Sequence, residues 1–127
     1  MRRAAALVAA IAFASLVHAP TTQARRVEAC PKYDGLFRQY GLPVETFSKI
    51  AYRESRCNPN SISPVRYTGR PDVGLLQIQA SWATVTRKIC NRQKVVLALT
   101  EPSCNVRVAA YLYANGGLRH WKATIGG

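Results

Sequence analysis

The sequence predicts one mainly helical domain that follows a short export signal. A chain of 127 residues has room for a single ordinary core. Hydrophobic residues make up 48% of it and recur at helical spacing, so the chain can bury a core and is not a disordered basic tail. No internal repeat is present, and no segment has the pattern of a parallel sheet.

Residues 1–24 have the organisation of a secretory signal peptide. Two arginines precede an apolar run at residues 4–17, which is shorter than the ~20 residues that a membrane-spanning helix needs. Small residues at the end of the segment place the expected cleavage after Ala24. The domain is then expected to comprise residues 25–127 of a secreted or periplasmic protein, and a buried N-terminal helix is the alternative.

The four cysteines lie in the expected mature part, at Cys30, Cys57, Cys90 and Cys104. An even number of cysteines in an exported chain indicates two disulfides, and four cysteines allow three pairings. A zinc site is the rival interpretation. However, the chain has no Cys-x-x-Cys pair, and His120 is the only histidine beyond the signal. We therefore expect neither a metal nor an organic cofactor.

The charge is strongly positive, with 18 Lys and Arg against 6 Asp and Glu and a net charge of +12. A nucleic-acid-binding domain would gather its basic residues on one face among aromatic ones. Here the arginines are spread along the whole chain, so a nucleic acid is not expected. The diffuse charge suits either an anionic polymer outside the cell or solubility alone, and it does not choose between them.

Two helices are predicted at the start of the mature chain. The first covers residues 31–40, between a proline that suits a helix start and Gly41, which suits a stop. The second begins at Pro43 and runs to about Arg56. Its apolar residues fall on one face at helical spacing. They are Val44, Phe47, Ile50 and Ala51.

A long loop and shorter helices are predicted for the remainder. Residues 58–73 are rich in proline and glycine and lack periodicity, which is typical of a loop. Ser81 is expected to cap a helix, and residues 95–99 form a brief apolar turn. Ser103 is expected to cap the last clear helix, which ends at Gly116.

One carboxylate lies on the apolar stripe of the second helix. Steps of three and four residues from Phe47 lead through Ile50 to Glu54, where the helix opens into the loop. Partial burial and the negative end of the helix dipole both raise the pKa of such a carboxyl. A carboxylic acid that keeps its proton near neutral pH can protonate a leaving oxygen. The alternative is a Glu54 that pairs with Arg53 or Arg56 and has no chemical role.

Three motifs follow one another in the mature chain. They are RESRCNPN at residues 53–60, DVGLLQI at residues 72–78 and PSCNV at residues 102–106. Their order and approximate spacing, over roughly residues 30–121, resemble the lytic transglycosylases with a soluble-lytic-transglycosylase (goose-lysozyme-like) domain. The resemblance implies a lysozyme-like fold. Several details are similar to small exported members associated with secretion and conjugation systems, and others, such as RESRC and the LRHW at residues 118–121, are similar to secreted actinobacterial and phage-associated members.

By this resemblance, Glu54 matches the single catalytic acid of enzymes that cleave the β-1,4 bond between N-acetylmuramic acid and N-acetylglucosamine in peptidoglycan. It would protonate the glycosidic oxygen and then accept the proton of the muramoyl C6 hydroxyl, which closes a 1,6-anhydro ring. The resemblance also implies that Ser55 orients Glu54, that Leu76 and Gln77 line the sugar cleft, and that Tyr113 is a cleft tyrosine. No second carboxylate is needed, whereas many glycosidases use a pair.

The sequence departs from the family pattern near its end. The family's Ala-Tyr-Asn-x-Gly motif, whose tyrosine faces the acid, is matched only in part by YANGG at residues 113–117, and Ala109 stands where a glycine is expected. The family pattern also favours a Cys30–Cys104 disulfide, which leaves Cys57–Cys90. Other residues have structural interpretations: Trp82 and Trp121 are expected to pack in the core or a lid, and His120 is expected at the surface.

Three alternatives to the transglycosylase stay open. A lysozyme-type hydrolase on the same scaffold would need Asp72 to position a water. A catalytically inactive wall-binding protein would keep the fold without turnover. A cationic membrane-active protein would need a uniformly basic helix face, which these helices lack. The expected partners are peptidoglycan glycan strands, with anionic envelope polymers or a secretion or conjugation apparatus as further ones, and the protein is expected to be a monomer.

Overall fold

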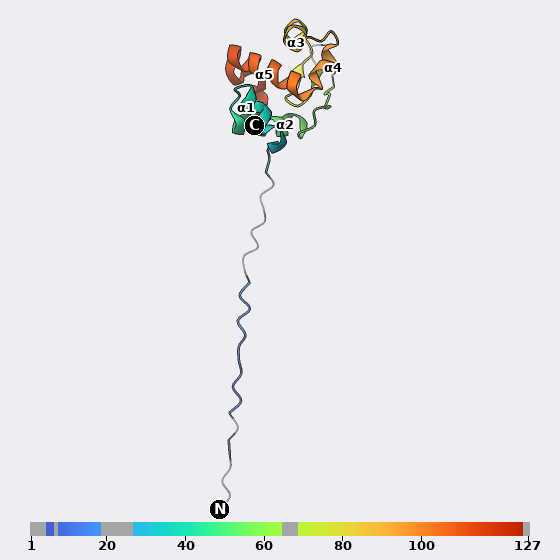
Figure 1. The fold of residues 1–127 in the computed structure, drawn as a ribbon. Coiled ribbons are helices and arrows are strands. Elements are labelled where there is room, and N and C mark those ends of the chain that lie inside the picture. Colours follow the sequence, from blue (N-terminus) through green and yellow to red (C-terminus); the bar gives the residue numbers. More distant parts are fainter. Residues whose placement is uncertain (1–4, 7, 19–26, 65–68, 126–127) are drawn as a thin grey trace, which may run out of the picture.

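The computed structural model describes residues 5–6, 8–18, 27–64 and 69–125, and from residue 31 onward it is built mainly from helices (Figure 1). The elements in chain order are η1 (Pro31–Tyr33), α1 (Asp34–Gln39), α2 (Val44–Ser55), β1 (Asp72–Val73), β2 (Ile78–Gln79), α3 (Ala83–Cys90), α4 (Val95–Leu99), α5 (Pro102–Gly116), η2 (Gly117–Trp121) and α6 (Lys122–Ile125). This order confirms the mainly helical class that the sequence predicts.

The described residues of the N-terminal segment are exposed and lie apart from the helices (Figure 1). The expected cleavage site after Ala24 falls outside the described residues. Within the part of the chain that the structure describes, no helix has the length and apolar character needed to cross a bilayer.

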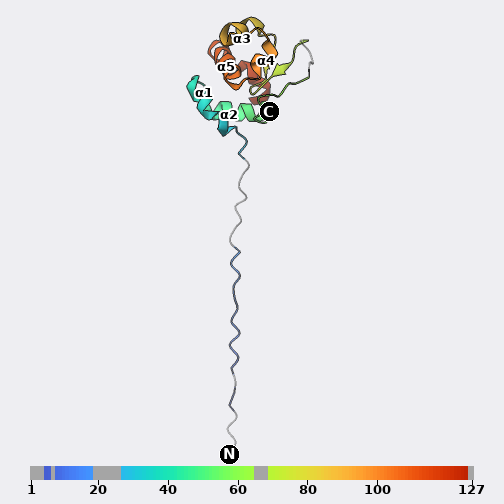
Figure 2. The ribbon, with the colours of Figure 1, turned by 45° about the vertical axis from the view of Figure 1, so that its right-hand side comes forward.

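Helix α2 carries the central part of the core. The stripe predicted for it is confirmed, since Phe47, Ile50 and Ala51 are at most 1% exposed. The ring of Phe47 packs edge-on against Tyr113 of α5 and Trp121 of η2, with centroid distances of 5.4 and 5.0 Å. Edge-on aromatic pairs at this spacing are stabilising. The first turn of α2 is therefore packed against α5 and η2. Figure 2 shows α1 and α2 on one side of the domain and α3, α4 and α5 on the other.

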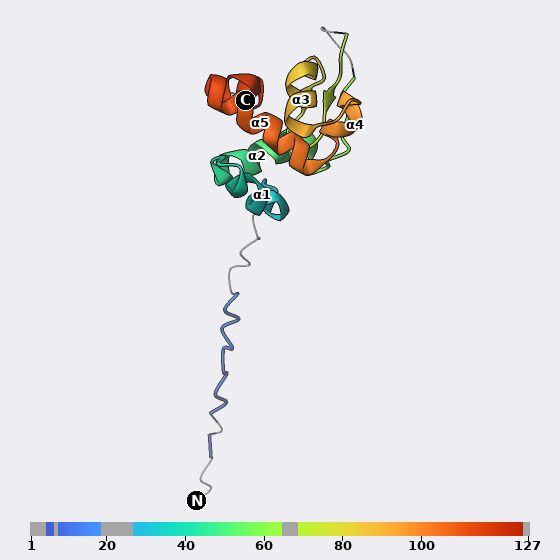
Figure 3. The same ribbon diagram turned by 45° about the horizontal axis from the view of Figure 1, so that its top comes forward.

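A small antiparallel sheet occupies the end of the predicted long loop. Asp72 lies opposite Gln79 in the β1–β2 pair, and Val73 lies opposite Ile78. Ile62 adds an isolated bridge to Val73. The sheet lies beside α3 and α4 (Figure 3). The loop predicted for residues 58–73 is therefore wrong at residues 72–73, which form one strand of a tight hairpin.

Asn105 of α5 fixes the turn between the two strands. Its side chain is fully buried. Its Nδ2 donates to the carbonyl oxygens of Val73 and Leu99, at 2.9 and 2.8 Å, and its Oδ1 accepts from the backbone N–H of Leu76 at 2.9 Å. One amide thus satisfies three buried backbone groups that would otherwise be unpaired. Asn105, the asparagine of the PSCNV motif, therefore has a structural role: it holds the hairpin.

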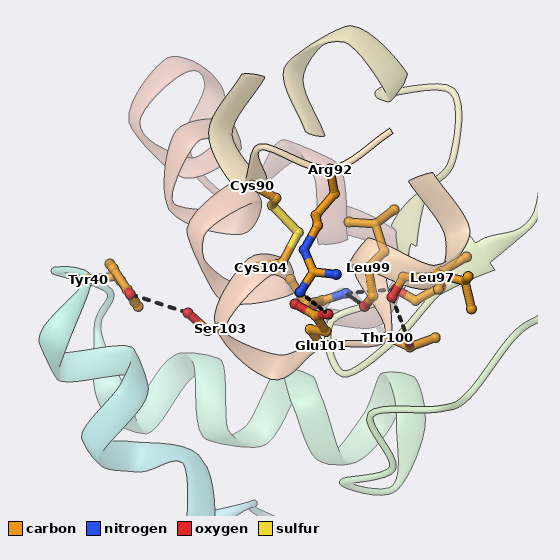
Figure 4. The surroundings of a disulfide bond; sticks show 11 residues. Tyr40, Cys90, Arg92, Leu97, Leu99, Thr100, Glu101, Ser103 and Cys104 are labelled. Carbon is orange, nitrogen blue, oxygen red and sulfur yellow. Dashed lines mark hydrogen bonds and ion pairs between the residues drawn. A yellow bond between two sulfur atoms is a disulfide. The ribbon is translucent and has the colours of Figure 1, made fainter. Parts of the chain in front are cut away.

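Two of the predicted helix caps are wrong. Trp82 directly precedes α3, and the hydroxyl of Ser81 instead donates to the side chain of Gln79. Helix α5 begins at Pro102, so Ser103 lies inside its first turn and faces Tyr40 across 3.3 Å (Figure 4). A proline at the first helical position has its φ already set and has no N–H to satisfy, which moves the start ahead of the serine.

The cysteines pair in chain order. The disulfides are Cys30–Cys57 and Cys90–Cys104, with Cα–Cα distances of 5.5 and 5.4 Å. The favoured pairing of Cys30 with Cys104 is therefore wrong. The reason lies at the end of α2, where Arg56 and Cys57 both adopt a left-handed backbone conformation and turn the chain back toward Cys30.

Each disulfide closes a short local loop. The first joins the start of η1 to the residues just after α2, and the second joins the end of α3 to the first turn of α5 (Figure 4). An ion pair between Arg92 and Glu101, 2.8 Å long, lies beside the second disulfide. With sequence separations of 27 and 14, each bridge stabilises the fold by roughly 3 kcal/mol through the entropy of the unfolded chain.

Candidate active site

Glu54 lies in the last turn of α2 and is half-buried. Its Oε1 accepts a hydrogen bond from the hydroxyl of Thr124 in α6. Burial raises the pKa of the Glu54 carboxyl above its ordinary value, the Thr124 hydrogen bond acts in the opposite direction, and the charge of Asp72 raises it further. The net direction is the one that the sequence predicts for this carboxyl.

The two arginines that flank Glu54 make contacts elsewhere. Nη1 of Arg53 donates to the carbonyl oxygen of Thr124 at 3.1 Å. The guanidinium of Arg56 lies over the ring of Tyr52, 4.5 Å from its centroid. The partners of both side chains are thus groups other than the Glu54 carboxyl, and the pKa of Glu54 stays raised.

Ser55 ties the end of α2 to the hairpin. Its Oγ donates to the carbonyl oxygens of Ala51, at 3.0 Å, and of Leu75, at 2.8 Å. The side chain is buried and is only 7% exposed. It thus fixes the backbone next to Glu54 by a hydrogen bond to the turn of the hairpin, and its hydroxyl donates to these two carbonyl oxygens and not to the carboxylate.

The turn residues Leu76 and Gln77 face the protein. Leu76 is fully buried, and its carbonyl oxygen accepts a 2.9 Å hydrogen bond from Nε1 of Trp121. The amide Nε2 of Gln77 donates to the carbonyl oxygens of Ser61 and Gly74, both at 3.0 Å, and its Oε1 accepts from Ser63. Both residues therefore shape the turn that borders the site, and the interactions of the Gln77 side chain hold the start of the long loop.

Tyr113 and Trp121 belong to the aromatic core around Phe47. Trp121 is 1% exposed, which confirms the packing role expected for it. Tyr113 is half-buried with its ring against Phe47, on the face of α5 that meets α2. The structure thus brings Glu54 and Ser55 together on α2, and it places Leu76, Gln77 and Tyr113 in the supporting packing around them.

Asp72 and His120 continue the site beyond Glu54. Burial raises the pKa of Asp72, and the nearby His120 acts against this shift. His120 is itself half-buried, so it is less exposed than the surface position expected for it. Burial lowers the pKa of His120, while a hydrogen bond with the backbone of Gln77 and the charge of Asp72 oppose the change. Glu54, Asp72 and His120 thus form a row of electrostatically coupled groups.

A hollow of about 370 Å³ opens beside His120. Trp82 lines it and is 38% exposed, so the core half of the core-or-lid packing expected for Trp82 is wrong. Tyr111, from α5, is a second exposed aromatic residue in this hollow. The complete lining is Trp82, Tyr111, Leu112, Asn115, Gly116, Arg119 and His120. Aromatic faces with a few polar groups are a typical lining for a binding pocket.

Sequence reasoning missed Thr124 and gave His120 no role in the site. Both follow Gly116, where the last predicted helix ends and where the sequence shows no further periodic pattern. The structure continues this segment as η2 and α6 and returns it to the end of α2 (Figure 2). No pattern in the sequence indicates a partner for His120, because it is a lone histidine among basic and aromatic residues.

A family model described as the transglycosylase SLT domain matches residues 36–123. The matched segment contains Glu54, Asp72 and His120, and Thr124 is the first residue beyond it. No curated protein and no solved structure shows a significant match. The matched segment covers well over half of the chain. The chain therefore belongs to the transglycosylase SLT domain family, which acts on peptidoglycan as lytic transglycosylases do.

Proposed function

We propose that this chain is an exported lytic transglycosylase that cleaves the MurNAc-β-1,4-GlcNAc bond of peptidoglycan and leaves a 1,6-anhydro-muramoyl end. Family membership supports the substrate class. The observation that carries the proposal is the half-buried Glu54 with its raised pKa at the end of α2. Such a group holds its proton until the glycosidic oxygen takes it.

The reaction needs one group that acts first as an acid and then as a base. The protonated carboxyl of Glu54 gives its proton to the glycosidic oxygen as the bond from C1 to that oxygen breaks. The muramoyl C6 oxygen then bonds to C1, and its proton passes to the Glu54 carboxylate. The substrate's own N-acetyl group supports the positive charge at C1, as the resemblance implies. No water is consumed, and Glu54 ends protonated for the next cycle.

A lysozyme-type hydrolase is the second candidate, and Asp72 favours it. The charge of Asp72 raises the pKa of Glu54, so a second carboxyl lies close enough to affect the protonation of the candidate acid. In a hydrolase, Asp72 would direct a water to C1 in place of the C6 hydroxyl. The two candidates use the same acid and differ only in the nucleophile.

The masses of the products distinguish these candidates. Purified, oxidised protein is incubated with peptidoglycan, and the soluble muropeptides are weighed by mass spectrometry. Products lighter by one water than hydrolysis gives, formed equally by an Asp72→Asn variant, support the transglycosylase. Fully hydrated products that depend on Asp72 identify the hydrolase. The absence of soluble products from folded protein contradicts both and leaves a wall-binding protein.

The aromatic hollow beside His120 supports a longer substrate path. We expect a sugar ring of the glycan to stack on Trp82, whose indole is 38% exposed. Trp82→Ala should then raise KM by about 2- to 10-fold with little change in kcat, since an aromatic contact contributes about 0.5–1.5 kcal/mol. The assay is the initial rate on solubilised glycan strands of several lengths.

The matched control for Trp82 is Leu97→Ala. Leu97 is another exposed apolar side chain, 61% exposed, but it lies on α4 and outside the hollow. The Leu97→Ala variant should leave KM unchanged. If Trp82→Ala also leaves KM unchanged for every strand length, the glycan does not pass through this hollow.

A further inference from the structure

Thr124 is bonded through two of its polar atoms to the last turn of α2. Its Oγ1 donates to Oε1 of Glu54, and its carbonyl oxygen accepts a 3.1 Å hydrogen bond from Nη1 of Arg53. The following residue, Ile125, lines a small hollow of about 210 Å³ together with Ile50 and Arg53. The short helix α6 is thus seated on α2, at the position of the candidate acid (Figure 2).

The direction of the hydrogen bond assigns different tasks to the two carboxyl oxygens. A threonine hydroxyl that donates to Oε1 uses a lone pair of that oxygen. In the neutral acid, the accepting oxygen is the carbonyl-like one, and the acidic proton then resides on Oε2. We propose that Thr124 is the positioning residue of Glu54: its hydroxyl fixes the rotation of the carboxyl and leaves Oε2 as the oxygen that exchanges the proton with the substrate.

The other hydroxyls of the region are engaged differently. The hydroxyl of Ser55 donates to the carbonyl oxygens of Ala51 and Leu75, and the ring of Tyr113 packs against Phe47. The bond from Arg53 to the backbone of Thr124 holds α6 in place while the hydroxyl holds the carboxyl. The hydroxyl that donates to the candidate acid is that of Thr124 in α6.

The same hydrogen bond adjusts the proton affinity of the site. A hydroxyl donor binds the carboxylate more strongly than the neutral acid, so it stabilises the charged form. It thereby lowers the pKa of Glu54, against burial and Asp72, which raise it. A group that must give a proton and then take one back works best when neither form is strongly favoured. Thr124 keeps the two forms of Glu54 closer to balance.

The test compares Thr124→Val, which has the same shape but no hydroxyl, with Thr124→Ser, which keeps the hydroxyl. We expect the valine variant to lower kcat about tenfold, the effect of one hydrogen bond, with KM nearly unchanged. Activity that requires protonated Glu54 is present below its pKa and is lost above it. Because loss of the donor raises that pKa, the alkaline limb of the kcat profile should move to higher pH. The serine variant should restore both the value of kcat and the position of the alkaline limb.

A matched control separates this role from a structural one. Thr46→Val removes the hydroxyl of a different threonine, which lies on α2. Thr46 lines the same small hollow as Ile125 but is about two turns of the helix away from Glu54. The Thr46→Val variant should leave the alkaline limb in place. The proposal is wrong if Thr124→Val folds normally and its limb does not move, or if Thr46→Val moves the limb equally.

This proposal rests on the proposed role of Glu54, and a second measurement separates the two. The carboxyl carbon of Glu54 can be titrated by NMR in the folded protein, without substrate. Thr124→Val should raise the observed pKa, and Thr124→Ser should return it toward the wild-type value. If the pKa rises while wild-type protein shows no turnover, the hydrogen bond is right and the enzyme assignment is wrong. If the pKa does not rise, the positioning proposal is wrong whatever the activity.

Discussion

Replacing Glu54 with glutamine is expected to abolish turnover and to leave the fold intact. Glutamine has nearly the same shape, and its amide oxygen can still accept the hydrogen bond from Thr124. It cannot give an acidic proton to the glycosidic oxygen, and it cannot take the proton of the C6 hydroxyl. Loss of this general acid and base should lower kcat by about 10²- to 10⁴-fold. The rate of muropeptide release measures the effect.

The thermal midpoint of the Glu54→Gln variant gives an independent check. Burial raises the pKa of Glu54 in the folded protein, so folding favours the protonated form. Stability from this group is present below the unfolded pKa and is lost as the pH rises through the folded pKa. At neutral pH glutamine stays neutral and does not have the cost of ionising in this position. The Tm of the Glu54→Gln variant should therefore be equal to or higher than that of the wild type. A stabilised but inactive variant is the signature of a group kept for chemistry.

Glu45→Gln is the matched control on the same helix. Glu45 is exposed and pairs with Lys49 at 2.7 Å, and this pairing lowers its pKa. Its replacement should leave the rate of muropeptide release within about twofold, because an exposed i,i+4 pair contributes little. A Glu54→Gln variant that keeps the activity of the Glu45→Gln control would remove Glu54 from the mechanism.

Gly74→Ala is expected to have the largest effect on stability. Gly74 has a φ of +82°, and an added Cβ would lie 2.2 Å from the carbonyl oxygen of Leu99 and 2.4 Å from Nδ2 of Asn105. These two atoms are hydrogen-bonded to each other, so neither can move away alone. Such a clash should lower the free energy of unfolding by about 4 kcal/mol or more, a large part of what a small domain has. Urea denaturation with a circular dichroism signal measures it.

Gly41→Ala separates the clash from the backbone conformation. Gly41 has a φ of +72°, close to that of Gly74, but an added Cβ would meet nothing within 4 Å. Its replacement should therefore lower the free energy of unfolding by only the left-handed penalty of about 1–2 kcal/mol. Equal losses in the two variants would show that the contacts with Leu99 and Asn105 do not matter.

Local patterns in the sequence predict the part of the site that α2 supplies. The stripe that buries Phe47 and Ile50 also places Glu54, because one helical period fixes all three. The direction of the Glu54 pKa follows from the same position. These inferences hold because a helix converts spacing along the chain into position in space.

The remainder of the site depends on contacts between distant segments. Thr124 lies 70 residues from Glu54 in the sequence, and no local pattern links the two. The pairing of Cys30 with Cys57 depends on two left-handed residues after α2, and neither Arg56 nor Cys57 is a residue type that marks such a turn. Trp82 could have packed inward or outward with the same neighbours in sequence. Only the folded chain decides between these possibilities.

The chain order of the disulfides also bears on how the oxidised protein is made. When a chain is delivered from its N-terminus, Cys57 is the first cysteine that can reach Cys30. Once these two are joined, Cys104 is the only partner left for Cys90. Oxidation in order of delivery therefore gives the native set directly. A crossed arrangement with Cys30–Cys104 would instead require early bonds to be broken and exchanged, which takes seconds to hours.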